Sequence, residues 1–189
     1  MFTYTCDTRY DEAAGFPSSL RQSVSGIAVR LASTEIARPL GAFSVNLDKE
    51  TLQIPYRVYY THDQLRSDLL GSLGDAKLVL ACLGTRHYDG YLRQQCLKHL
   101  LSSGESWVLP YIVQLAGEYV LEIVDEVAET IESVDSSSVA AFVRQNPAYL
   151  ATLARRVTSY WNEYHRHDYP CRSDYPGSKV LASLLRTVE

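Results

Sequence analysis

The chain has 189 residues, of which 46% are hydrophobic and 21% are charged, with a formal net charge of −4 at pH 7. This length suits one domain with a full hydrophobic core. The acidic balance argues against binding to the phosphate backbone of nucleic acids, which relies on clustered lysine and arginine. The sequence contains no run of about 18 apolar residues, so we expect no membrane span.

The N-terminal residues and the cysteines indicate the compartment. Asp7, Asp11 and Glu12 lie where a secretory signal would be apolar. The four cysteines lie far apart, and Cys82 and Cys96 fall at apolar positions of expected helices. Because buried free thiols in a reducing compartment explain such cysteines better than disulfides, we predict a cytoplasmic protein.

In the first 60 residues the spacing of the apolar residues changes from a helical to a strand-like pattern. Residues 1–17 show little periodicity, so we expect an irregular N-terminal arm. A helix is predicted over about 19–35, where apolar residues recur at spacings of three or four, namely Leu20, Val24, Ile27 and Leu31. Residues 42–60 alternate between apolar and polar positions on both sides of the polar stretch Asp48–Thr51. This pattern is typical of a β-hairpin, which Pro55 would restrict to an edge strand.

Short helices are predicted after the hairpin. Thr61 and Gln64 fit a capping box at the start of one helix. Asp75 can cap the next helix, which Gly84 would end. Residues 107–131 carry apolar residues on two faces, and Gly117 could break them into a pair of helices.

The last helices have clear start signals. Asn146-Pro147 predicts a helix start, with a capping side chain followed by proline at the first helical position. A final amphipathic segment is predicted over 178–187.

Residues 75–102 form the most informative stretch, two short helices joined by a tight turn. On a helical wheel Arg93 falls inside the apolar side formed by Leu92, Cys96, Leu97, Leu100 and Leu101. Because an unpaired buried charge costs several kcal/mol, we expect the Arg93 guanidinium to be buried and hydrogen-bonded. The nearest available partners are carbonyls at the end of the preceding helix and Asp89, which can also cap the second helix.

The pattern D-x-x-L-R-x-x-C-L-x-x-L at residues 89–100 resembles the second helix of a HEAT repeat. Gln95 departs from the family, which usually has alanine there, and residues 76–83 would be the first helix of the repeat. Residues 105–133 resemble a second copy in which Glu122 stands at the position of Arg93. The resemblance, over residues 75–133, implies stacked helical pairs that each bury a face against their neighbours.

We therefore predict one mainly α domain over residues 1–189. It consists of the arm 1–17, a helix with the β-hairpin over 19–60, and a helical core over 61–189. The helical hairpins pack either as a short HEAT-like α-α superhelix or as an irregular bundle.

The polar turn Thr85–Gly90 is the first candidate site. Arg86, His87 and Tyr88 are its candidate binding residues, because an arginine, a histidine and Asp89 could bind an anion or act as general acid and base. In the purely structural alternative Asp89 caps the helix, Gly90 eases the turn and His87 faces solvent.

A second polar segment spans residues 165–171. His165, His167, Asp168 and Cys171 are ligand types that zinc or iron accepts. However, His165 and His167 would point roughly 200° apart on a continued helix and could not share an ion. We therefore predict no metal site and no cofactor.

The sequence contains no signature of covalent or nucleotide-dependent catalysis. A G-x-S-x-G elbow, a P-loop and a dinucleotide fingerprint are all missing. Cys82 and Cys96 on apolar faces would be poor nucleophiles, because burial raises the pKa of a thiol. We predict no catalytic residues.

These observations favour a non-enzymatic protein-interaction or scaffold module that binds a protein or peptide along a helical-repeat face. A homo-oligomer is also possible, and neither nucleic acid nor membrane is an expected partner. The alternative is a small enzyme or ligand-binding protein with a pocket near the 85–90 turn. A concave pocket beside His87 would favour the enzyme. A tyrosine-rich patch would favour the binder, since the chain has 14 tyrosines and tyrosine suits interfaces.

Overall fold

The computed structural model describes residues 11–33, 35–37 and 41–188. Within these ranges the protein is mainly helical and has one antiparallel pair of strands, which confirms the predicted mainly α class with a β-hairpin. In the same ranges, none of the helices combines the length and the apolar character needed to cross a bilayer.

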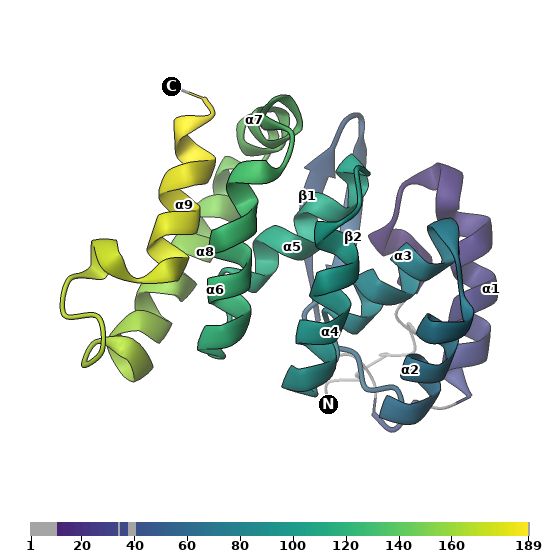
Figure 1. Ribbon diagram of the computed structural model, residues 1–189. Coiled ribbons are helices and arrows are strands. Elements are labelled where there is room, and N and C mark those ends of the chain that lie inside the picture. Colours follow the sequence, from purple (N-terminus) through teal and green to yellow (C-terminus); the bar gives the residue numbers. More distant parts are fainter. Residues whose placement is uncertain (1–10, 34, 38–40, 189) are drawn as a thin grey trace, which may run out of the picture.

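Most of the elements follow one another with short connections, and the longest connection joins α8 to α9. The helices are α1 (Arg21–Ala32), α2 (His62–Gly71), α3 (Gly74–Gly84), α4 (Gly90–Leu101), α5 (Leu109–Leu115), α6 (Leu121–Thr130), α7 (Ser136–Gln145), α8 (Pro147–Tyr160) and α9 (Pro176–Arg186), and the strands are β1 (Ala42–Leu47) and β2 (Glu50–Pro55). Figure 1 shows α4, α6 and α9 side by side, with α3, α5 and α8 behind them. Helices α3 and α4, α5 and α6, and α8 and α9 therefore form three neighbouring pairs.

The hairpin forms as the alternation predicts. Phe43 lies opposite Ile54 and Val45 opposite Leu52, and all four side chains are buried on one face. Asp48 in the turn has a φ of 53°, which aspartate tolerates better than most residues. The hairpin packs through β1 on α7 and α8, and through β2 on the turn at residues 12–15.

Asn146 marks the start of α8 as predicted, but its side chain has a different role from the expected cap. The main-chain N–H of Asn46 in β1 donates to Asn146 Oδ1 at 2.7 Å. Asn146 Nδ2 donates to the carbonyls of Asn46 and Phe142, at 2.7 and 2.8 Å. The amide therefore fastens the hairpin to α7 and α8, because it satisfies both main-chain groups of one strand residue.

The expected irregular arm is only partly observed. Residues 1–10 lie outside the described ranges, whereas residues 12–15 form a 3₁₀ turn. Phe16 is fully buried, with its ring centroid 5.3 Å from that of Tyr111 and 5.9 Å from that of Trp107. The Tyr111 hydroxyl donates to the Gly15 carbonyl at 2.7 Å. Residues 12–16 are therefore packed against Trp107 and Tyr111, although the sequence of this segment is too short to show a period.

Two further cap predictions are also wrong. Helix α2 begins directly after Thr61, but the Thr61 side chain makes no capping hydrogen bond. Asp75 lies inside the first turn of α3 rather than at its cap, because α3 already begins at Gly74.

Two glycines allow close helix packing. Helix α3 ends at Gly84, where a Cβ atom would overlap Cys96 Sγ of α4. Gly117 lies in the break between α5 and α6, as predicted for a helical pair. A Cβ atom there would lie 2.8 Å from Leu153 Cδ1 of α8. Both positions need glycine because a neighbouring helix approaches the backbone.

Candidate functional site

The turn between α3 and α4 is held by main-chain and side-chain hydrogen bonds. Asp89 caps α4 as predicted, because its Oδ1 accepts from the N–H groups of Tyr91 and Leu92 at 2.8 and 3.3 Å. The chain after β2 runs beside the turn, where the Val58 N–H donates to the Arg86 carbonyl at 2.9 Å. One side of the turn is therefore packed against the chain that follows β2.

His87 is fully buried, so the expectation that it faces solvent is wrong. Its Nε2 lies 2.9 Å from the Tyr60 carbonyl, and its Nδ1 accepts from the Asp89 N–H at 3.1 Å. Because the Tyr60 carbonyl can only accept, Nε2 carries a proton. Because Nδ1 accepts from the Asp89 N–H, it carries none, and the ring is neutral. Burial lowers the pKa of His87 from its ordinary value. Both ring nitrogens are occupied by main-chain partners.

Arg86 is also buried and bound to the main chain. Its Nε donates to the Pro55 carbonyl at 3.3 Å and its Nη2 to the Tyr56 carbonyl at 2.9 Å. Burial lowers the pKa of Arg86 to about 9, while the charge of Glu118 acts in the opposite direction. The guanidinium therefore stays protonated at neutral pH.

Arg93 is fully buried and paired, as its position on the wheel predicts. Its Nη1 donates to the carbonyls of His87 and Tyr88, at 3.0 and 2.9 Å. The expected ion partner Asp89 is used as the helix cap instead. The carboxylate near Arg93 is that of Glu118, whose Oε2 lies 3.4 Å from Arg93 Nη2.

Glu118 joins three guanidinium groups, which sequence reasoning missed. Its Oε2 lies 2.8 Å from Arg57 Nη2, and its Oε1 lies 3.9 Å from Arg86 Nη2. We call Arg57, Arg86, Arg93 and Glu118 the arginine–glutamate cluster. One signal could have identified it, because Glu118 is the only charged residue between Glu105 and Glu122 in an otherwise apolar stretch. The cluster fastens the α3–α4 turn to the connection between α5 and α6.

Tyrosines lie beside Arg93, at one side of this cluster. Tyr88 and Tyr119 flank Arg93, whose guanidinium carbon lies 6.0 Å from the Tyr119 ring centroid. The Tyr119 ring lies 6.2 Å from that of Tyr160 and 6.4 Å from that of Tyr164. We call Tyr88, Tyr91, Tyr119, Tyr160 and Tyr164 the tyrosine surface. Exposed fractions are 43% for Tyr88, 81% for Tyr91, 49% for Tyr119 and 59% for Tyr164.

Of the three predicted binding residues, only Tyr88 thus presents its side chain to solvent. Arg86 and His87 lie beneath it as buried supports. Whether the turn binds a ligand stays a prediction.

The second polar segment places its two histidines in different environments. His165 is buried in a π-helical turn, Trp161–His165, with Nε2 3.1 Å from the Tyr119 carbonyl and its ring stacked on Tyr175 at 5.3 Å. His167 is exposed. Across the described part of the chain, no group of three or more His, Cys, Asp or Glu side chains is placed to hold a metal ion.

Two of the three cysteines in the described residues are buried free thiols. Cys82 and Cys96 are buried and free, as predicted, and Cys171 is exposed and free. Burial raises the pKa of Cys96 to about 12 and that of Cys82 well above its ordinary value. Neither buried thiol is therefore reactive at neutral pH. Cys6 lies outside the described residues.

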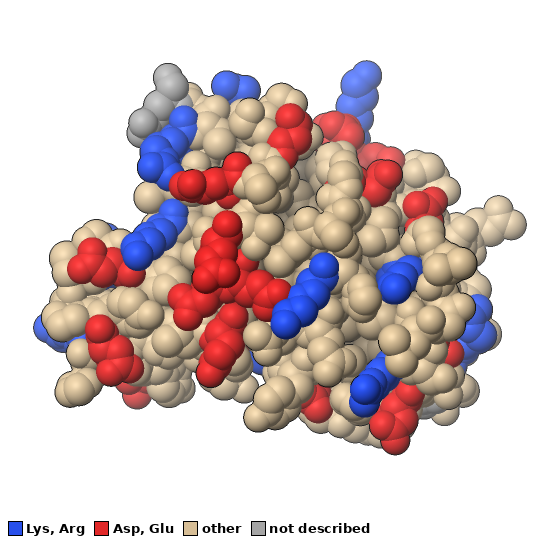
Figure 2. Space-filling view, in the orientation of Figure 1, with Lys and Arg blue, Asp and Glu red and all other residues tan. Residues whose placement is uncertain are grey.

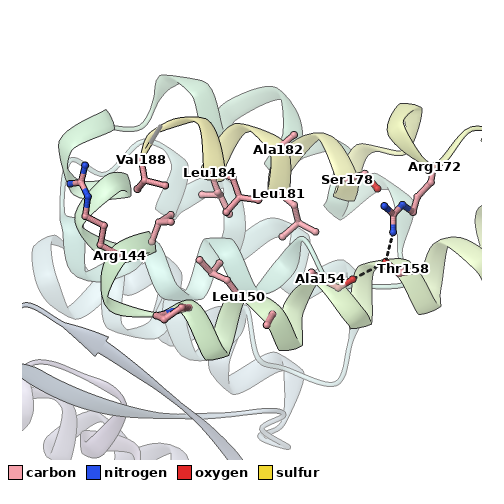
Figure 3. Close-up of a pocket in the computed structure, with 14 residues that line it drawn as sticks. Arg144, Leu150, Ala154, Thr158, Arg172, Ser178, Leu181, Ala182, Leu184 and Val188 are labelled. Carbon is pink, nitrogen blue, oxygen red and sulfur yellow. Dashed lines mark hydrogen bonds between the residues drawn. The ribbon is translucent and has the colours of Figure 1, made fainter.

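An apolar groove lies at the other end of the helical layers, between α7, α8 and α9. Its volume is about 640 Å³, and Figure 3 shows Leu150 and Ala154 facing Leu181 and Leu184 across it. Sequence reasoning identified the amphipathic helices that form the groove, but not the groove between them.

On the face shown in Figure 2, acidic side chains gather over α6, which carries Glu122, Asp125, Glu126 and Glu129.

The chain matches no family model, no curated protein and no solved structure. The chain's own residues therefore carry the functional conclusions.

Proposed function

We propose that the protein is a non-enzymatic protein-interaction module, built as a HEAT-like stack of helical pairs, that binds a protein or peptide partner through the tyrosine surface. The observation that carries this proposal is the group of tyrosines at the turns of successive helical pairs, of which four are exposed and Tyr160 is half-buried.

Contacts between the turns support the stacked arrangement. Arg93 of one pair binds carbonyls of its own turn and approaches Glu118, which lies in the turn of the next pair. His165, after α8, lies within hydrogen-bond distance of the Tyr119 carbonyl in that same turn. In a solenoid each repeat contacts only its neighbours, so a line of contacts from turn to turn is expected. Of the two residues that carry the HEAT resemblance, Arg93 is part of this line, whereas Asp89 caps α4 within its own turn.

The physical character of the tyrosine surface supports binding. Tyrosine offers a large contact area for few rotatable bonds, and it is enriched with arginine at interfaces. Here two rings lie against guanidinium groups, because the buried Arg93 lies 6.0 Å from the Tyr119 centroid and the half-buried Arg156 lies 5.6 Å from the Tyr160 centroid. A surface held in this way loses less side-chain freedom on binding.

The alternative, a small enzyme or ligand-binding protein with a pocket near the 85–90 turn, stays a prediction. It needs a titratable group free to exchange protons or bind a ligand. His87 is the group proposed for that role, and its two ring nitrogens are held by Tyr60 and Asp89. Among the described residues we find no observation that favours this alternative.

Site-specific photocrosslinking tests the proposal. The photoreactive residue p-benzoylphenylalanine replaces Tyr91 or Tyr164 in separate variants, which are irradiated in extracts of the native host. A matched variant carries it at Leu73, which is 83% exposed at the opposite end of α3. We expect discrete crosslinked species at the two tyrosine positions and none at Leu73, and Tyr119→Ser should reduce them.

Each outcome has a definite meaning. A crosslinked species of twice the mass identifies a second copy of the chain as the partner. Equal crosslinking at Leu73, or crosslinks unaffected by Tyr119→Ser, would contradict the assignment of the binding surface.

A further inference from the structure

The groove between α8 and α9 is a second surface, separate from the tyrosine surface. Its walls are mostly aliphatic, and Leu185 at its edge is 51% exposed. Exposed apolar surface that forms a continuous groove is typical of an interaction site rather than of chance exposure. The groove is open to solvent along one side, so an occupant would keep one face in water.

Two guanidinium groups lie at opposite ends of the groove. Figure 3 shows Arg144, from the last turn of α7, at one end and Arg172 at the other. Arg172 donates to the Thr158 hydroxyl at 3.1 Å. Among the described residues, neither arginine has a carboxylate partner within ion-pair distance. The two ends of an otherwise apolar groove are therefore positively charged.

We propose that this groove binds an amphipathic α-helix of a partner protein, whose apolar face fills the groove and whose carboxylates near each end pair with Arg144 and Arg172. The groove is lined from Ser178 in α9 to Val188 just after the end of this helix, and about ten residues of helix rise about 15 Å. A helix of similar length presents apolar residues at i, i+3 or i+4, and i+7, which is the usual arrangement for binding in a groove.

Shape and charge both favour a helix over a single fatty acid. A fatty acid has one carboxylate, so it could pair with only one of the two arginines. In a groove open along one side it would also leave part of its chain in water, which opposes binding. An amphipathic helix turns its polar face to the solvent and can place an acid at each end.

A display selection tests the proposal without a known partner. The probe is a library of randomised 14-residue peptides with helix-forming positions, selected on the full chain. We expect enriched sequences with apolar residues at the groove spacing and Asp or Glu near both ends. Selection on the Leu185→Glu variant should lose this enrichment. Selection on Leu70→Glu, which changes an exposed leucine on α2, should retain it.

One enriched peptide, labelled with fluorescein, then gives affinities by anisotropy. Arg144→Glu and Arg172→Glu should each weaken binding about tenfold or more, because each places a like charge against a carboxylate. Arg155→Glu, on an exposed position of α8 that does not line the groove, should change the affinity less than about twofold. Circular dichroism of each variant confirms that the helices are intact.

Several outcomes would overturn the proposal. They are a selection without enrichment, enrichment that Leu185→Glu retains, and charge reversals no stronger than Arg155→Glu. Oleate that binds the groove while the enriched peptide does not would assign the groove to a fatty acid instead. Tyr119→Ser should leave peptide affinity unchanged and Leu185→Glu should leave the photocrosslinks unchanged, so failure of one proposal is distinguishable from failure of the other.

Discussion

The α3–α4 turn and the α8–α9 groove use the same residue types in opposite ways. In the turn, Arg86 and Arg93 are buried, donate to main-chain carbonyls and lie within ion-pair distance of Glu118, so they face partners inside the protein. In the groove, Arg144 and Arg172 lie at the ends of an apolar surface and, among the described residues, have no carboxylate within ion-pair distance. A polar motif is therefore weak evidence of a site until the partners of its side chains are known.

The largest effect should come from the carboxylate of the arginine–glutamate cluster. Glu118→Gln leaves the buried Arg86 and Arg93 and the partly buried Arg57 without their shared counter-charge, so we expect a loss of about 3–5 kcal/mol in the free energy of unfolding. Chemical denaturation measures it. Glu122→Gln on the exposed face of α6 is the matched control, expected within about 0.5 kcal/mol of the parent. Equal values for the two variants would show that the cluster does not fasten the turns.

Arg93→Lys should have the next largest effect. An ammonium cannot reach the carbonyls of His87 and Tyr88 and also Glu118, so we expect a loss of about 2 kcal/mol in unfolding free energy. The exposed Arg66→Lys on α2 is the control for the substitution itself. A loss below about 0.5 kcal/mol would show that the contacts of Arg93 contribute no more to stability than those of an exposed arginine.

The buried imidazole of His87 should give a smaller effect that depends on pH. Burial lowers the pKa of His87 in the folded protein, so below pH of about 6.5 the unfolded chain takes up a proton that the folded protein does not. Stability should therefore fall as the pH decreases through that range. Denaturation at several pH values measures this slope, and His87→Gln should reduce it.

The pKa of a second histidine, His99, is lowered as well. Burial and the charge of Lys77 lower the pKa of His99, so part of the slope should remain in His87→Gln. Comparison with His99→Gln separates the two contributions. A His87 pKa above 6.5 in an NMR titration would contradict the neutral, main-chain-bound ring.

The smallest effect on stability should come from the groove. Leu185→Glu and Arg172→Glu change exposed side chains, so we expect unfolding free energies within about 0.5 kcal/mol of the parent. Thermal denaturation measures this difference. A loss comparable to that of Glu118→Gln would mean that the groove belongs to the core rather than to a binding surface.

Part of the fold and of the candidate site could be predicted from local pattern. The spacing of Val24, Ile27 and Leu31 places one face of α1 in the core, and the alternation around Asp48 gives the hairpin. The burial of Arg93 follows from its place on the α4 wheel. In each case the period of the backbone fixes which face a side chain occupies, and neighbouring residues are enough to show it.

Only the tertiary structure decided which partners those side chains meet. Glu118 reaches Arg57 across 61 positions of sequence, and Asn146 binds Asn46 across 100. The position of His87 in the turn could be predicted, but its burial depends on the chain after β2, and the groove depends on how α9 packs beside α8. The sequence alone determined the helices, the hairpin and the faces they bury, because these follow from local periodicity. Packing between distant segments decided which polar groups are used internally and which surfaces stay open.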